Sequence, residues 1–273
     1  MTLRRQLSNA FPRIMGMHIR RHTRPLFAVA SASLAILSLA YGNFVPGQRL
    51  PGRNILMYGI SFVVLVASVG LCFTRTAKRS ALTIVIYLAV WAGISTPQII
   101  AQPLSIGAWY GFVEAMTSLV GAWILYVELS AFNPTAERSV RTAQILFGLS
   151  CAFYGYSHFA YANYTASMVP GWLPGHLTLA YLTGAAHIAA GIGIVAGVLP
   201  GLAAVLEASM MSLFGLLVWI PSFFAQPRPT WAASPQAQWS ELVVNLMLAA
   251  AAWIVAGSLF QRPNKVGQDT SND

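Results

Sequence analysis

Eight apolar segments, each long enough to cross a lipid bilayer, follow one another along this chain of 273 residues. A helix that crosses the hydrocarbon core needs about 20 mostly apolar residues. We expect spanning helices at residues 25–42, 54–73, 80–97, 106–129, 142–160, 177–198, 202–221 and 239–260. Few polar stretches interrupt them, and only 8% of the residues are charged, against about 25% in a soluble domain. The sequence therefore predicts an all-α polytopic membrane protein without a soluble domain.

The basic residues are divided unequally between the two sides of the predicted bundle. Counted over alternate loops, thirteen of the sixteen Lys and Arg residues fall on one side, and Arg49, Arg53 and Arg228 fall on the other. Because cytoplasmic loops carry an excess of Lys and Arg, we expect both termini in the cytoplasm and the chain in the cytoplasmic (inner) membrane of a bacterium. The same distribution accounts for the net charge of +9, so the expected partner is a lipid bilayer and not nucleic acid.

An internal repeat divides the chain into two units of four helices. The same features recur in the same order in both halves: IIAQP at 99–103, Trp109, Glu114 and Trp123 in the first, and FFAQP at 223–227, Trp231, Glu241 and Trp253 in the second. We expect a basic cytoplasmic tail at 1–24, a first unit at 25–132, a cytoplasmic linker at 133–141, a second unit at 142–261 and a polar cytoplasmic tail at 262–273. Two similar four-helix bundles with an even number of helices share one orientation, so their pseudo-twofold axis would run along the membrane normal.

Ionisable side chains inside a membrane are costly, so each of them is a functional hypothesis. His187 lies deepest, about ten residues into its predicted span and therefore near the middle of the bilayer. Gly184, Gly191 and Gly193 surround it and would let another helix approach closely. The functional interpretation is a proton relay, a quinone hydrogen-bond donor, or a metal or haem ligand. The structural interpretation is a neutral histidine that is bonded to a neighbouring helix.

His158 lies near the outer end of its predicted span, among Tyr154, Tyr156, Tyr161 and Tyr164. Residues 154, 158 and 161 share one helical face. These hydroxyls and the imidazole could bind a polar headgroup or a quinone ring, or they could anchor the helix at the interface. At 1.5 Å per residue, His187 is expected about 15 Å deeper than His158. The two histidines are therefore not expected to ligate one haem.

Glu114 and Glu241 occupy equivalent places early in the last helix of each unit. A helix N-terminus stabilises a carboxylate there, although their symmetry also permits a paired site between the units. Glu207, one turn into its span at the cytoplasmic end, is expected to reach the headgroups. A metal site formed by His158, His176 and Glu241 is geometrically possible, but the sequence has no ligand-spacing motif for it. We expect no metal and no evident cofactor, with a bound quinone still open.

A stretch of the second unit, residues 154–195, carries several motifs in order: Gly155 and Phe159, then VPGWLP at 169–174, LTG at 182–184 and GIG at 191–193. It resembles the DoxX/DoxD family of small four-helix membrane proteins, which have an outer loop of the form VP.WLP and a second helix of the form LTG..E..GGIGL. The whole chain is similar to two such units fused, and His187 stands where the family often has glutamate. The resemblance implies a role in a membrane-bound redox system, for example as a subunit of a thiosulfate–quinone oxidoreductase.

Three functions are compatible with these features, and none of them decides whether the protein is an enzyme. The first is a DoxX-like accessory or quinone-interacting subunit of a redox system with a membrane or periplasmic partner protein. Its ligand pocket, in the outer half of the bilayer, would be lined by Tyr154, His158, Trp172 and His187. The second is a small-molecule or proton-coupled carrier that uses Glu114 and Glu241. The third is a non-catalytic membrane scaffold for a partner enzyme.

Overall fold

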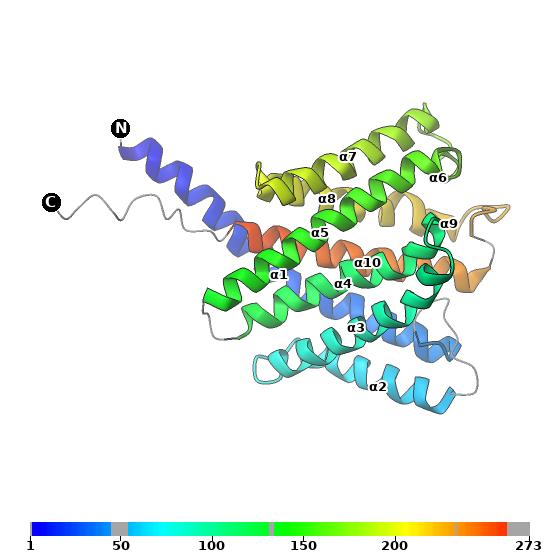
Figure 1. The fold of residues 1–273 in the computed structure, drawn as a ribbon, viewed down its shortest axis with the longest axis horizontal. Helices are drawn as coiled ribbons and strands as arrows, with labels where there is room; N and C mark the ends of the chain where they lie inside the picture. The colour runs from blue at the N-terminus through cyan, green and yellow to red at the C-terminus, as the bar shows by residue number, and fades with distance from the viewer. Residues whose placement is uncertain (1, 45–53, 131–133, 233, 261–273) are drawn as a thin grey trace.

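A computed structural model describes residues 2–44, 54–130, 134–232 and 234–260, which are almost entirely helical (Figure 1). The helices are α1 (Thr2–Tyr41), α2 (Asn54–Gly70), α3 (Ala77–Ala101), α4 (Ile106–Glu128), α5 (Pro134–Ala160), α6 (Ala162–Met168), α7 (His176–Ala196), α8 (Pro200–Phe214), α9 (Ile220–Ser222) and α10 (Pro235–Leu259). A π-helical turn, η1 (Gly215–Trp219), joins α8 to α9. Within the described ranges no residue lies in a strand, so the all-α prediction is confirmed.

Six helices in the described ranges are long and apolar enough to cross a membrane: His18–Tyr41, Ala77–Ala101, Ile106–Glu128, His176–Ala196, Pro200–Ser222 and Pro235–Leu259. They indicate a multi-pass membrane protein. The remaining two expected spans coincide with α2 and α5. The apolar part of α2, Ile55–Gly70, is shorter, and the first turns of α5 are polar. The count of eight spans therefore stays a prediction for these two helices.

Helix α1 begins well before the expected span at residues 25–42. It runs unbroken from Thr2 to Tyr41, so the basic residues expected in a tail at 1–24 extend the first spanning helix instead. Its first turns project beyond the other helices (Figure 1). Further along, the Arg20 guanidinium lies 3.7 Å from the Glu128 carboxylate at the end of α4, so this extension contacts the last helix of its own unit. The expected tail at 262–273 lies outside the described residues.

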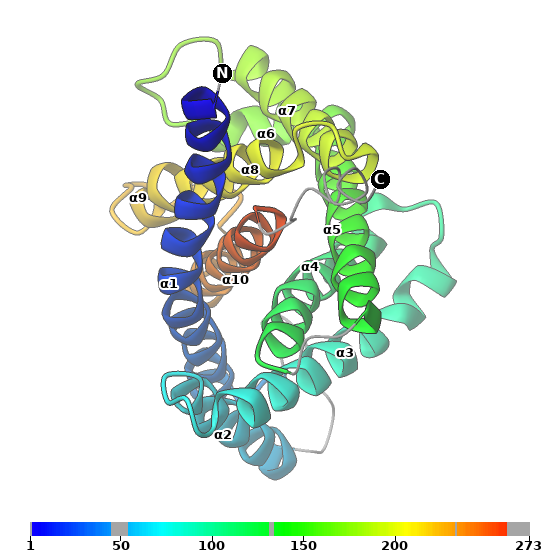
Figure 2. The same cartoon turned by 90° about the vertical axis from the view of Figure 1, so that its left-hand side faces the viewer.

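The two predicted units have matching helix contacts. Sequence neighbours pack in order, α1–α2–α3–α4 in the first unit and α5–α7–α8–α10 in the second. The first helix of each unit also packs on the last helix of the other, and α4 packs on α10 at the centre with the remaining long helices around them (Figure 2). This is the pattern of contacts that the predicted pseudo-twofold repeat requires. The division into two similar four-helix bundles stays a prediction, and the first helix of each predicted unit covers the last helix of the other.

Small residues allow α4 and α10 to approach closely at this centre. A Cβ atom at Gly121 would lie 2.7 Å from the Cα and Cβ atoms of Ala251, a distance that real side chains do not adopt. Ala250, Ala251 and Ala252 on α10 are fully buried. Helix association in a membrane depends on such close backbone packing. Helix α10 is accordingly the most buried of the six candidate spans.

Two pairs of glycines hold α5 against α7. A Cβ at Gly155 would lie 2.5 Å from the Gly184 carbonyl oxygen, and one at Gly191 would lie 2.5 Å from the Gly148 carbonyl oxygen. The helices are antiparallel and the two pairs are seven residues apart on each, so backbone meets backbone at two successive places. The predicted close approach at Gly184 and Gly191 is confirmed. This packing brings the side chains of α5 and α7 into one site.

Candidate functional site

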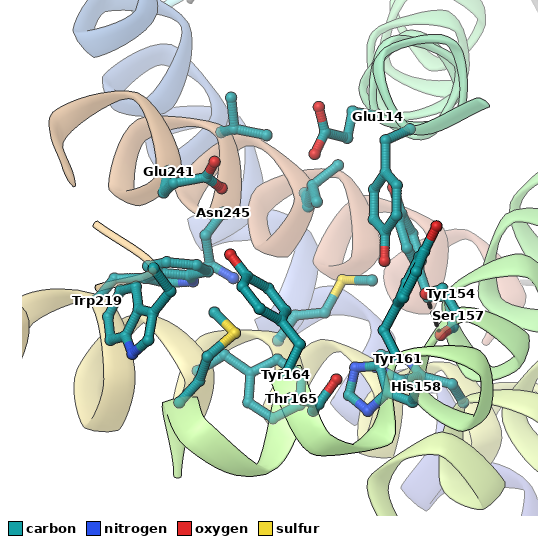
Figure 3. A pocket seen from close by; sticks show the side chains of 18 of the residues that line it. Glu114, Tyr154, Ser157, His158, Tyr161, Tyr164, Thr165, Trp219, Glu241 and Asn245 are labelled. Atoms are coloured by element: carbon teal, nitrogen blue, oxygen red, sulfur yellow. Dashed lines mark hydrogen bonds between the residues drawn. The ribbon is translucent and has the colours of Figure 1, made fainter. Parts of the chain in front are cut away.

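A cavity of about 650 Å³ lies at the α6 end of the assembly, between the central helices and the second unit (Figure 3). Its walls come from α4, α5, α6, α7, α8, η1, α10 and the segment before α10. The lining residues are Gly107, Tyr110, Glu114, Tyr154, Ser157, His158, Tyr161, Tyr164, Thr165, Met168, His187, Met211, Phe214, Trp219, Trp231, Glu241, Val244, Asn245 and Leu248. The described lining includes two carboxylates, two histidines and several aromatic rings, and no lysine or arginine.

Five of the six residues singled out from the sequence line this one cavity. Tyr154, His158 and His187, expected in a quinone pocket, share it with Glu114 and Glu241, expected in a carrier site. The sixth residue, Trp172, is not among the lining residues and is 72% exposed, in the connection between α6 and α7. Two hypotheses that used different residues therefore refer to the same place in the fold.

The two histidines are neighbours, and the expected 15 Å difference in their depth is wrong. The rings of His158 and His187 have centroids 5.1 Å apart and meet edge to face. The expectation placed the end of α5 at the membrane surface. The chain continues from Ala160 into α6, which packs on α7, so the end of α5 does not mark the outer limit of this part of the structure.

His187 has a charged partner on the next helix. Its Nδ1 atom lies 2.7 Å from Oε1 of Glu207 on α8, and the exposed fractions of His187 and Glu207 are 2% and 1%. The expectation that Glu207 reaches the headgroups is wrong. His187 lies nine residues before the end of α7 and Glu207 seven residues after the start of α8, so in this helical hairpin the two reach the same depth.

Hydrogen-bond contacts hold the Nδ1 edge of the His158 ring. Its Nδ1 atom is 3.0 Å from the hydroxyl oxygen of Thr183, and that hydroxyl donates its only hydrogen to the carbonyl of Leu179 or Ala180. The Thr183 oxygen therefore accepts a hydrogen bond from Nδ1–H. Neutral His158 then carries its lone pair on Nε2, the nitrogen on the opposite side of the ring. A cavity ligand can be bound there as a hydrogen-bond donor.

Aromatic rings surround the histidines on the side of α5 and α8. The Tyr154 and Phe214 rings lie 6.0 Å and 5.8 Å from the His187 ring between centroids, and Phe214 also stacks on His158 at 6.1 Å. The Tyr154 hydroxyl is 3.1 Å from the hydroxyl of Thr117 on α4. Ring edges and faces thus fill the space beside the imidazoles and keep that part of the cavity apolar.

The two glutamates come from the two central helices. Glu114 projects from α4 and Glu241 from α10, and Figure 3 shows both carboxyl groups on the side of the cavity opposite His158. Asn245, one turn after Glu241, adds an amide to the same wall. The cavity consequently has an acidic side and an imidazole side, with tyrosines between them.

A π-helical turn borders the cavity at Gly215–Trp219. A Cβ at Gly215 would lie 2.8 Å from Oδ1 of Asn245, so a side chain at this position would have to displace the Asn245 amide from the turn. Trp219 lines the cavity, and its ring lies 5.3 Å from that of Trp231. Single π-turns inside α-helices are frequent at functional sites. This one widens the seventh predicted span where it borders the cavity.

In the described part of the chain, no group of three or more His, Cys, Asp or Glu side chains is arranged to hold a metal ion. His158 and Glu241 line the cavity, but His176 is not among the lining residues. The three residues considered for a metal site are therefore not brought together there.

Sequence reasoning missed Glu207 and the two tryptophans of the cavity wall. Counting residues from the turn between α7 and α8 would have placed Glu207 beside His187. No comparable signal identifies Trp219 and Trp231, because an interfacial belt is the ordinary place for tryptophan.

Comparisons with models of protein families, with curated proteins and with solved structures find no match to this chain. The resemblance to the DoxX/DoxD family thus stays a prediction.

Proposed function

We propose that this protein binds a quinone, or a small lipophilic molecule of similar shape, as a DoxX-like accessory subunit of a membrane redox system. The observation that carries the proposal is the single cavity that His158, His187, Tyr154 and two carboxylates share. With the Lys- and Arg-rich side in the bacterial cytoplasm, the cavity would face the outer half of the cytoplasmic membrane. A periplasmic or membrane partner protein would supply or accept electrons.

The shape and polarity of the cavity suit such a ligand. Its volume of about 650 Å³ is in the usual range for small-molecule sites. A quinone is a flat ring with oxygen atoms at opposite ends, and its reduced form has two hydroxyls in their place. Nε2 of neutral His158 can accept a hydrogen bond from one hydroxyl, and Glu114 or Glu241 can accept from the other across the cavity. The Trp219 and Trp231 rings offer apolar surface for the ligand ring.

The His187–Glu207 pair also supports the resemblance to DoxX. His187 replaces the glutamate that the family often has after LTG, which removes a carboxyl group from α7. Glu207 returns a carboxyl group to the same depth from α8, 2.7 Å from the His187 ring. An acid and an imidazole are therefore both available beside the ligand cavity.

Titration with decylubiquinone, reduced to its hydroquinone so that it carries the two donating hydroxyls, tests the proposal in the intact protein, purified in mild detergent. Because Trp219 and Trp231 line the cavity, saturable quenching of tryptophan fluorescence and a rise in the thermal midpoint are expected. Loss of a hydrogen bond in a buried site costs about 1–3 kcal/mol, so His158→Leu should weaken binding by roughly 5- to 150-fold. Trp172→Phe is the matched control, since Trp172 is exposed outside the cavity. Absence of any saturable response in the wild type would refute quinone binding.

A proton-coupled carrier is the second candidate, and the pseudo-twofold arrangement favours it. Repeated units around a central site are typical of transporters. Glu114 and Glu241 lie on the two helices at the pseudo-twofold axis, and both line the cavity. Substituting both by glutamine should abolish ligand-driven proton uptake into proteoliposomes, while Glu137→Gln, at an exposed carboxyl in the first turn of α5, should not. Unchanged uptake in the double variant would remove this candidate.

A further inference from the structure

A row of three titratable side chains leads from the cavity wall into the interior of the second unit. His158 on α5 and His187 on α7 line the cavity, with ring centroids 5.1 Å apart. Glu207 on α8 is not a lining residue and is 1% exposed, and its Oε1 lies 2.7 Å from Nδ1 of His187. Each member of the row thus lies beside the next, and only the last is closed off from the cavity.

The Glu207 carboxyl is incompletely paired for a permanently charged group. Its Oε1 bonds to His187, whereas Oε2 is buried and has no close hydrogen bond among the described residues. The Cys151 thiol, a weak donor, lies beside this carboxyl group. A carboxylate has about four lone-pair sites and loses much of its hydration on burial. A neutral carboxyl group with one hydrogen bond tolerates this surrounding better. His187 is the group in hydrogen-bond contact with Glu207 through which the carboxyl can exchange a proton.

An imidazole can pass a proton between its two nitrogens without moving. With Glu207 ionised, Nδ1 of His187 carries the hydrogen that Oε1 accepts. When Nε2 takes up a proton from the cavity side, the Nδ1 proton moves along the 2.7 Å hydrogen bond to Oε1. The ring ends neutral as the other tautomer, and Glu207 ends protonated and donates to Nδ1. One proton enters and one is stored, so charge and atoms balance.

We propose that Glu207 is a proton-storage site that exchanges protons with the cavity through His187, with His158 as the first acceptor. The inference rests on the proposed function and deepens it, because a proton released by a ligand in the cavity could be held at Glu207. Its test needs no ligand. Other titratable groups face the row: Cys151 and Tyr154 from α5, Glu114 from α4 and Glu241 from α10. Of these, Cys151 is the one beside the Glu207 carboxyl, and Glu114 and Glu241 lie on the far wall of the cavity.

Infrared spectroscopy of the ligand-free protein, reconstituted in lipid and taken through a pH series, measures the protonated carboxyl group of Glu207. A carbonyl stretch of the buried Glu207 carboxylic acid should be present at low pH and disappear as the pH rises. Subtracting the Glu207→Gln spectrum from the wild-type spectrum isolates this band, because bands of Glu114 and Glu241 are common to both proteins. The matched control is Glu137→Gln, which removes an exposed carboxyl group on α5 and should keep the band. Absence of a carboxylic-acid band from the wild-type minus Glu207→Gln difference at every pH overturns the storage site.

The rate at which the same band appears after a sudden drop in pH tests the route. The Glu207 band should grow more slowly in His187→Gln by about ten-fold or more, which is about 1.4 kcal/mol in the barrier. His158→Phe should slow it in the same direction. Unchanged rates in both variants overturn the route through the histidines. Glu207→Asp keeps an acid if Glu207→Gln fails to fold. Since no quinone is present, these outcomes are independent of the decylubiquinone titration.

Discussion

Replacing Gly155 by alanine would test whether backbone packing of α5 on α7 positions the two histidines. The new Cβ would lie 2.5 Å from the Gly184 carbonyl oxygen and 2.5 Å from Cγ1 of Ile188. An ordinary contact begins near 3.4 Å, so the helices must separate by about 0.9 Å. The Gly184 oxygen belongs to the backbone and cannot rotate away. Overpacking of this kind costs about 1–3 kcal/mol.

The matched control is Gly93→Ala on α3, where a Cβ would meet no atom within 4 Å. Removing an unpacked helical glycine should be neutral or stabilise by about 0.5–1 kcal/mol. A domain of this size loses about 2–4 °C of thermal midpoint per kcal/mol, so Gly155→Ala should unfold roughly 2–12 °C below the wild type in detergent. It should also weaken decylubiquinone binding, because α5 carries His158 away from His187. Equal midpoints for the two variants would refute the close-packing account.

Two further predictions concern the buried pair and the membrane topology. His187→Leu leaves the buried Glu207 carboxylate without its partner and should lower the free energy of unfolding by about 3–5 kcal/mol. Adding Glu207→Leu should recover most of this loss in a double-mutant cycle measured by thermal unfolding. Additive losses from the two substitutions would contradict the pairing. In a chain whose native cysteines are replaced by serine, cysteines at the exposed positions Glu137 and Gly171 should react with an impermeant thiol reagent from opposite faces of sealed vesicles. Reaction from one face would show that α5 does not cross the membrane.

The helices were predictable from the sequence because each satisfies its own backbone hydrogen bonds. In a membrane, that requirement and the length of apolar sequence decide where a span lies. The repeat was predictable too, since matching motifs such as IIAQP and FFAQP occur in order in both halves. The start of α1 was not predicted, because a basic segment gives no apolar signal, although arginine is a good helix former.

Depth within the membrane was the least predictable property of the site residues. Counting from the expected end of a helix assumes that every helix ends at the interface. Under that assumption, His158 and His187 were predicted at different depths, and Glu207 was predicted to reach the lipid headgroups. The chain beyond α5 continues through α6, and the turn between α7 and α8 brings residues equally distant from it to one level. Connections, not helix ends, therefore decide which polar groups meet.

The sequence by itself determined a helical chain of apolar spans in two related units and a short set of ionisable residues within them. It could do so because hydropathy and repetition are local properties that need no knowledge of neighbours. Only the tertiary structure decided that Glu114, Glu241, His158 and His187 face one cavity and that His187 is paired with Glu207. Those contacts join helices distant in sequence, and they depend on how closely glycine and alanine let the helices pack.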